Sequence, residues 1–124
     1  MGASGVGIFD DDVACDVRIA LYDRFRAGES SESASDAVLE DFSDAIEDEE
    51  DGPVVILALA AAQWEAGRLD SRIKKRALRI IERGADFRWD VDEYREQRIA
   101  VLNDLAAMLN RVAPPPKPIN ELEW

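Results

Sequence analysis

The hydrophobic pattern of the chain centres on one apolar run from Gly52 to Trp64, in which residues 54–62 contain no polar side chain. A helix that is apolar on every face is buried in a protein core or in a membrane. At about 1.5 Å per residue the run spans about 20 Å, and a bilayer requires roughly 20 residues. The run therefore predicts a buried core helix. Trp64 is expected to close one end of the core, with a hydrogen-bond partner for its indole N–H.

The boundaries of this central helix are predicted at residues 53–66. Pro53 suits the first helical position, because the N–H that proline lacks would have no partner there. Asp51 or Gly52 is the candidate N-cap, and Gly67 is a typical C-terminal stop.

Helical periodicity predicts four further helices, at residues 11–27, at residues 30–47 or 33–47, at residues 70–83 and at residues 90–112. The fold class is therefore all-α, a compact orthogonal bundle of about five helices around the buried central helix. Residues 1–112 form a single domain, which opens with a glycine-rich loop over residues 1–9. Residues 113–124 form a proline-rich extended tail, because proline ends helical structure and favours the polyproline II conformation.

Two of these elements leave alternatives open. The first helix carries a second apolar stripe, Cys15, Ile19 and Tyr22, which either the N-terminal loop or a partner would cover. The tail is expected to lie across the surface, with Leu122 or Trp124 docking, and a Pro-x-x-Pro ligand motif is the alternative.

The last helix is expected to turn one broad apolar face inward, formed by Tyr94, Ile99, Val101, Leu102, Leu105, Met108, Leu109 and Val112.

The composition excludes several chemistries. The chain of 124 residues has no histidine, and Cys15 is its single cysteine. Ser-His-Asp and Cys-His catalysis, an internal disulfide and the common zinc sites are therefore excluded. No catalytic residue and no cofactor is predicted. The sequence contains no secretory signal and no span that could cross a membrane, so we expect a cytoplasmic location and no membrane association.

The acidic residues are concentrated in the first half of the chain. Residues 1–52 contain 16 acidic and 3 basic residues, a net charge of −13. Residues 53–112 contain 9 acidic and 11 basic residues, a net charge of +2, and the whole chain has a net charge of −12. A large negative surface repels the phosphates of nucleic acid and favours a basic protein partner. Monomer and homodimer both remain open.

Carboxylates in the second predicted helix repeat every three or four positions and so share one face. This face and the linker after it hold the candidate partner-binding residues, Asp36, Glu40, Asp44, Glu47, Asp48, Glu49, Glu50 and Asp51. The helix at residues 70–83 carries arginines at a compatible spacing, Arg72, Arg76, Arg79 and Arg83. The two rows either pair with each other inside the molecule or leave the acidic row free for a partner.

A second group of carboxylates lies near the N-terminus. Asp10, Asp12 and Asp16 are candidate metal ligands, because magnesium and calcium accept sites made entirely of oxygen ligands. Capping is the alternative interpretation. Any of Asp10, Asp11 and Asp12 could accept hydrogen bonds from the free N–H groups at the start of the first helix.

Several stretches of the chain match a family pattern. The chain opens Met-Gly-Ala-Ser-Gly-Val-Gly-Ile-Phe-Asp-Asp-Asp, and residues 77–86 read Ala-Leu-Arg-Ile-Ile-Glu-Arg-Gly-Ala-Asp. These stretches resemble an uncharacterised bacterial domain-of-unknown-function family, whose members open Met-Gly-x-Trp-Gly-x-Gly-x-Phe-Asp-Asn/Asp-Asp and later carry Ala-Leu-x-Ile-Ile-x-x-Gly-Ala-Asp. Ser4 stands where the family has tryptophan. The resemblance implies a small bacterial cytoplasmic protein and supplies no known activity.

Together these observations predict a non-catalytic acidic protein-interaction protein. Its specific form would be an inhibitor or immunity-type protein that presents its acidic face to a basic partner. Two alternatives come from other classes. One is a carboxylate-based divalent-metal-binding protein or hydrolase that uses the N-terminal aspartates. The other is a regulatory or scaffold module that uses the arginine row of residues 70–83.

Overall fold

A computed structural model describes residues 7–84, 92–112 and 114–118, with the side chains of residues 92–94 excepted. Over these residues the chain forms helices and no β-strand, which confirms the all-α prediction. The helices are α1 (Asp12–Arg26), α2 (Ser31–Asp41), α3 (Ser43–Glu47), α4 (Asp51–Glu65), α5 (Ser71–Arg83) and α6 (Asp92–Leu109). None of the helices in this described part has the length and apolar content of a membrane span.

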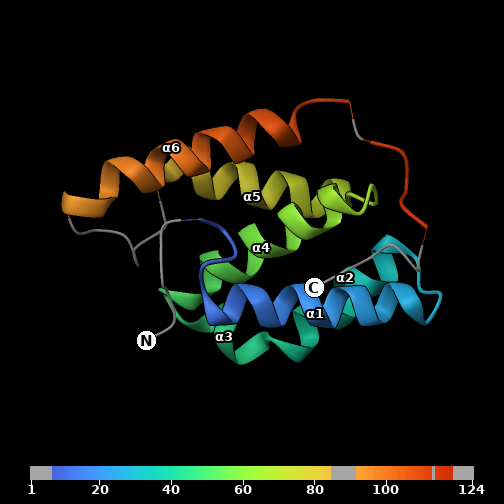
Figure 1. Ribbon diagram of the computed structural model, residues 1–124. Helices are drawn as coiled ribbons and strands as arrows, with labels where there is room; N and C mark the ends of the chain where they lie inside the picture. The colour runs from blue at the N-terminus through green and yellow to red at the C-terminus, as the bar shows by residue number, and fades with distance from the viewer. Residues whose placement is uncertain (1–6, 85–91, 113, 119–124) are drawn as a thin grey trace.

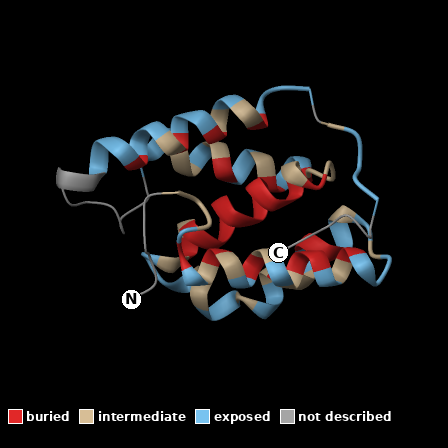
Figure 2. Ribbon diagram, viewed as in Figure 1, coloured by how far each residue is buried: buried red, intermediate tan, exposed pale blue. Residues whose placement is uncertain are grey.

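Helix α4 lies at the centre of the bundle. It passes between α1, α2 and α3 on one side and α5 and α6 on the other (Figure 1). Every residue from Val54 to Gln63 is buried, as Figure 2 shows along this helix, so the predicted central helix is confirmed. Trp64 at its end is half-buried. The enclosed indole N–H of Trp64 meets no acceptor among the described residues, contrary to the prediction.

The start of α4 differs from the prediction. The helix begins at Asp51, and the side chain of Asp48 accepts the main-chain N–H groups of Glu50 at 2.8 Å and of Asp51 at 2.9 Å. Asp48 therefore does the work of a cap, and the prediction of Asp51 or Gly52 as N-cap is wrong. Pro53 is the third helical residue, where its missing N–H still costs no helical hydrogen bond.

The helix predicted to end at residue 47 is divided in two, so the described residues form six helices rather than the predicted number of about five. Phe42, between α2 and α3, has φ −106° and ψ 21°, outside the helical region. The break turns Ala45 and Ile46 onto the core beside α4. Gly52 permits this approach, because a Cβ there would lie 2.5 Å from the main-chain oxygen of Ile46.

The second apolar stripe of α1 is covered from within the molecule. Tyr22 is buried, and its hydroxyl donates to the main-chain oxygen of Ala62 in α4 at 3.5 Å. The thiol of Cys15 donates to the main-chain oxygen of Phe9 at 3.1 Å, so the N-terminal loop covers this part of the stripe. Ile19 stays at the surface, 37% exposed.

Helix α6 turns a narrower apolar face inward than predicted. Its buried apolar residues are Leu102, Leu105 and Leu109. Ile99 is 46% exposed and Val112 is 95% exposed, which corrects the prediction for both. Val112 is exposed because α6 ends at Leu109, and Ile99 is exposed because it lies beside the stripe of Leu102, Leu105 and Leu109 that packs in the core. The predicted start at Asp90 and the side chain of Tyr94 lie outside the described part.

Within the tail, residues 114–118 are extended and lie against the turn between α4 and α5 (Figure 1). The main-chain N–H of Lys117 donates to the oxygen of Ala66 at 3.0 Å. Gly67 in the same turn has φ +72°, which confirms it as the stop of α4. Leu122 and Trp124, proposed as docking residues, lie outside the described residues.

Candidate functional site

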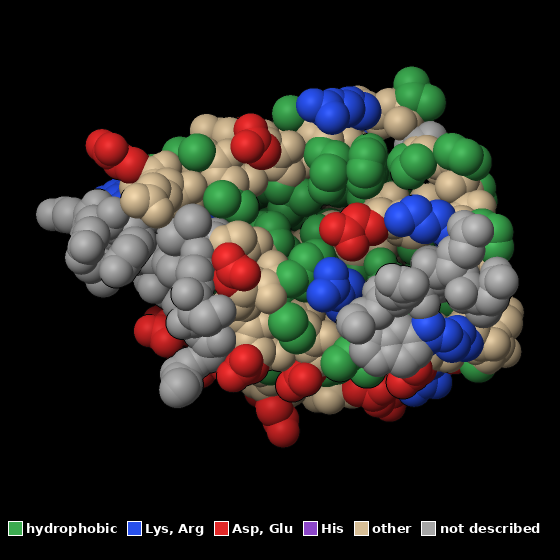
Figure 3. Space-filling model, in the orientation of Figure 1, with side chains coloured by type: hydrophobic (Ala, Val, Ile, Leu, Met, Phe, Trp, Pro, Cys, Tyr) green, Lys and Arg blue, Asp and Glu red, His purple; other side chains and the backbone are tan. Residues whose placement is uncertain are grey.

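The predicted partner-binding carboxylates lie on four consecutive segments of the chain: α2, α3, the linker after α3 and the first residue of α4. We call the set the acidic face: Asp36, Glu40, Asp44, Glu47, Asp48, Glu49, Glu50 and Asp51. Asp51 is half-buried, and the other seven residues are exposed. Figure 3 shows acidic side chains gathered along the lower edge of the molecule, where α1 and α3 lie.

The arginine row meets this face at one residue. The guanidinium of Arg72 lies 3.1 Å from the carboxylate of Asp36. Arg76, Arg79 and Arg83 are exposed and form no ion pair with any residue in the described part of the chain. The physical reason is that α5 packs on α4 and α6, so the turns of α5 after Arg72 do not lie beside α2. The acidic face is therefore not neutralised by the arginine row.

Helix α1 supplies a pairing that the sequence did not indicate. Arg24 lies 3.2 Å from the carboxylate of Asp41 and 3.3 Å from that of Glu29, at the two ends of α2. These carboxylates, Glu29 first, raise the pKa of the Arg24 guanidinium above its ordinary value. Asp41 is thus engaged, whereas the nearby Glu40 and Asp44 form no ion pair with any described residue.

Among the N-terminal aspartates, Asp11 is the N-cap of α1. Asp11 is buried, and its carboxylate accepts the main-chain N–H groups of Val13 at 2.8 Å and Ala14 at 3.3 Å. Asp10 accepts the N–H of Gly7 at 3.0 Å, while Asp12 and Asp16 are exposed. Among the residues that the structure describes, no group of three or more Asp, Glu or Cys side chains is placed to hold a metal ion.

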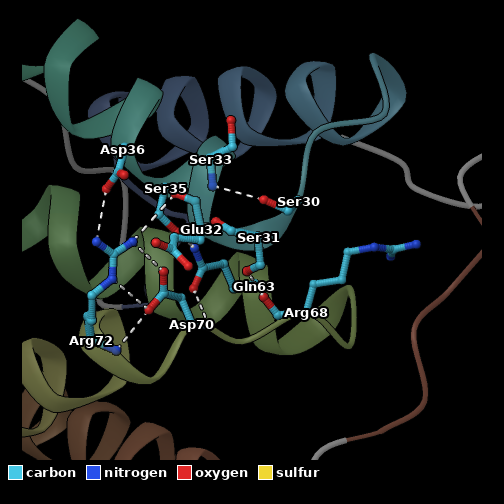
Figure 4. Close-up of polar contacts among 10 residues, drawn as sticks. All are labelled: Ser30, Ser31, Glu32, Ser33, Ser35, Asp36, Gln63, Arg68, Asp70 and Arg72. Atoms are coloured by element: carbon cyan, nitrogen blue, oxygen red, sulfur yellow. Dashed lines mark hydrogen bonds and ion pairs between the residues drawn. The ribbon is translucent and has the colours of Figure 1, made fainter.

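A buried polar network joins α2, α4 and α5, and the sequence reading missed it (Figure 4). Gln63 is fully buried, and its side-chain N–H donates to the hydroxyl of Ser35. The hydroxyl of Ser35 donates in turn to the main-chain oxygen of Ser31 at 2.7 Å. The side-chain oxygen of Gln63 accepts the N–H of Asp70 at 2.9 Å. A polar residue at the end of an otherwise apolar helix was the available signal.

Asp70 and Arg72 carry the network to the surface. The carboxylate of Asp70 caps α5 through the N–H of Arg72 at 2.8 Å and also accepts from the Arg72 guanidinium at 2.8 Å. These bonds from Arg72 hold the pKa of the Asp70 carboxyl below its ordinary value, although burial acts in the opposite direction. The same contacts raise the pKa of Arg72.

Two shallow depressions flank this point and share Glu32. One, of about 300 Å³, is lined by Ser31, Glu32, Asp70, Ser71 and Arg72. The other, of about 350 Å³, is lined by Ser30, Glu32, Ser33 and Asp36. Their serine hydroxyls lie beside carboxylates and a guanidinium, without the histidine that would activate them as nucleophiles. The hydroxyls, carboxylates and guanidinium that line the two depressions can offer hydrogen bonds and charge to a polar partner.

Comparison of the chain with models of known protein families, with curated proteins and with solved structures finds no match. The family resemblance of residues 1–12 and 77–86 remains a prediction.

Proposed function

We propose that this chain is a cytoplasmic, non-catalytic protein that binds a basic protein partner through its acidic face. One observation carries the proposal. Glu40, Asp44, Glu47, Glu49 and Glu50 are exposed and form no ion pair within the described residues, although the same chain carries an arginine row.

The electrostatics favour a partner of opposite charge. The chain has a net charge of −12, and repulsion among its own carboxylates opposes the compact state. A basic surface docked on the acidic face would relieve that repulsion. Complementary fields would also steer the encounter and discriminate against other acidic proteins.

An inhibitor or immunity-type role is the specific form of this proposal. A row of carboxylates can occupy a basic groove that would otherwise hold the phosphates of a nucleic acid. A basic enzyme bound in this way would lose activity in proportion to the fraction bound. The alternative of a metal-binding protein or hydrolase built on Asp10, Asp12 and Asp16 gains no comparable support. Asp10 accepts a hydrogen bond from the main-chain N–H of Gly7, and the described residues contain no group of three or more side chains placed to hold a metal ion.

Charge-reversed baits test the proposal. Glu40→Lys with Asp44→Lys reverses the centre of the acidic face. Glu96→Lys with Asp104→Lys changes the net charge equally at exposed positions on α6 and serves as the matched control. Each tagged protein is incubated with lysate of the source organism, washed at low and then at high salt, and analysed by mass spectrometry.

We expect a basic protein that wild type and the α6 control retain at low salt, that high salt releases, and that the acidic-face variant does not retain. Equal retention by all three baits would contradict the proposal. Retention by none would do the same. Adding the wild-type chain to the purified partner then measures inhibition.

A second candidate function rests on the arginine row itself. Arg76, Arg79 and Arg83 are exposed and unpaired within the described residues, which is what a regulatory or scaffold module using α5 would require. A mobility-shift assay with duplex DNA at increasing salt tests it, with Arg76→Glu and Arg79→Glu as the variant. Binding that the variant loses would support this function, and the absence of any shift would dispose of its nucleic-acid form.

A further inference from the structure

The turn between α4 and α5 holds the chain's own proline-rich tail by its main chain. The N–H of Lys117 donates to the oxygen of Ala66 at 3.0 Å, and the guanidinium of Arg68 donates to the oxygen of Lys117 at 2.7 Å. Both bonds involve the main chain of Lys117 and not its side chain. The turn thus recognises an extended backbone.

The receiving residues are held in place by the rest of the fold. The Arg68 guanidinium lies over the ring of Phe25, 5.3 Å from its centroid, and donates to the oxygen of Ala66 at 2.9 Å. The main chain of Arg68 is fixed on both sides, because its N–H donates to Gln63 at 2.8 Å and its oxygen accepts from Ser31. In Figure 4 the Arg68 side chain extends away from the buried network, toward the tail.

Gly67 gives the tail room. Its φ of +72° favours glycine, and a Cβ at this position would lie 2.7 Å from the carbonyl carbon of Pro115. Because Gly67 has no side chain, the carbonyl group of Pro115 can pass close to the backbone of this turn.

The tail itself is a ligand that is already extended. Residues 114–118 read Pro-Pro-Pro-Lys-Pro, and four of these five residues are prolines, which fix φ and restrict the residues before them. Little entropy is lost when such a segment docks. Pro115, Pro116, Lys117 and Pro118 are all exposed, so the contact buries little apolar surface.

From these contacts we infer that the α4–α5 turn is a binding site for extended proline-rich peptides, and that the chain's own tail occupies it as an exchangeable ligand. The site selects Pro-Pro-x-Pro segments in which x is any residue except proline. The prolines supply the extended backbone, and x must supply the N–H that Ala66 accepts. The side chain of x is free, because that of Lys117 faces solvent.

Tethering explains why the tail holds the site with so few contacts. A segment attached by a short linker has an effective concentration on the order of millimolar. A free peptide with equal contacts competes poorly until the tail is weakened. A partner that carries two such segments, or a higher affinity for the site, would displace it.

The test uses the full-length chain and one variant that removes a single atom group from the tail. Lys117→Pro deletes the N–H that Ala66 accepts and keeps the backbone extended. Lys117→Ala retains the N–H and is the matched control. The probe is the acetylated, amidated peptide Ala-Pro-Pro-Pro-Lys-Pro, titrated into each ¹⁵N-labelled protein while the amide signals of Gly67 and Arg68 are followed by NMR.

We expect the peptide to shift these signals saturably in Lys117→Pro, whereas wild type and Lys117→Ala need about tenfold more peptide because the tail competes. A peptide of prolines alone should shift nothing. Arg68→Lys, combined with Lys117→Pro, should weaken the response, because lysine lacks the two-pronged geometry of the guanidinium.

Three results would overturn the inference. One is a Lys117→Pro protein whose Gly67 and Arg68 signals respond to no peptide. Another is an equal response to the all-proline peptide. The third is an equal response of all three proteins to the probe. None of these measurements involves the acidic face, so they stand apart from the test of the proposed function.

Discussion

Gln63 and Asp70 are joined inside the core by a hydrogen bond in which the main-chain N–H of Asp70 donates to the side-chain oxygen of Gln63, 2.9 Å away. The donor belongs to the N-cap of α5 and the acceptor to α4. The amide nitrogen of the same Gln63 side chain reaches Ser35 in α2. One buried amide therefore sets three helices relative to one another.

Replacing Gln63 by leucine should lower the free energy of unfolding. The volume is similar, but the N–H of Asp70 loses its partner, and an unsatisfied buried donor costs about 1–3 kcal/mol. We expect urea unfolding of Gln63→Leu to show a free energy of unfolding lower by about 2 kcal/mol. Gln97→Leu, at an exposed position of α6, should change it by less than about 0.5 kcal/mol. Equal effects of the two substitutions would show that the buried amide does not hold the helices together.

The pKa of Asp70 predicts a dependence of stability on pH. This pKa is lowered in the folded chain by hydrogen bonds from Arg72, relative to about 3.9 in an unfolded one. The contribution of the Asp70 charge to the free energy of unfolding is therefore present above pH ~3.9, and it is lost as the pH falls through the pKa of Asp70 in the folded chain. Asp70→Asn keeps a capping side chain without the charge. The difference in unfolding free energy between wild type and Asp70→Asn should shrink as the pH falls from 6 toward 3, and a difference independent of pH would contradict the assignment.

Tyr22 predicts an effect at the opposite end of the pH scale. Burial, followed by the negative charge of Glu65, raises the pKa of Tyr22 from 10.0 to about 12. Folding thus favours the neutral phenol. The contribution of the neutral phenol to the free energy of unfolding is lost as the pH rises from about 10 through 12. Ultraviolet titration should show a phenolate that forms near pH 12 in wild type and is missing in Tyr22→Phe. A wild-type titration with no transition above pH 11 would contradict this.

Gly67 and Gly84 form a matched pair for substitution by alanine. Both have positive φ, of +72° and +66°, so alanine at either position should lower the free energy of unfolding by about 1 kcal/mol through backbone strain. A Cβ at Gly84 meets nothing within 4 Å, whereas one at Gly67 meets Pro115. Gly67→Ala should therefore lose more stability than Gly84→Ala and should expose the tail to limited proteolysis. A tail equally resistant in both variants would argue against close packing at Gly67.

Some elements could be predicted because the signal is local. The run at residues 54–62 has no polar face, so only burial suits it, and Gly67 marks the end of its helix by its freedom at positive φ. The start of the same helix was misplaced, because Asp48 supplies the cap from outside the helix. The break at Phe42 was missed for a similar reason, since it depends on how Ala45 and Ile46 meet α4.

The candidate site shows the same division. Spacing along the sequence is enough to place Asp36 and Glu40 on one face of α2, because helical periodicity is a local property, whereas Asp44 lies beyond the break at Phe42, in α3. Whether the arginines cover that face depends on the direction in which α5 leaves α2, and the sequence left both outcomes open. In the structure Arg72 forms an ion pair with Asp36, whereas Arg76 is exposed and pairs with no described residue.

By itself, then, the sequence determined the all-α class, the buried central helix, the acidic first half and the lack of histidine chemistry, since each follows from composition or from periodicity within one element. Only the tertiary structure decided that Gln63 links three helices, that Arg68 holds the tail, and that Glu40, Asp44, Glu47, Glu49 and Glu50 form no ion pair within the described residues. These features join residues far apart in the chain, and contacts of that kind are set by how the helices pack.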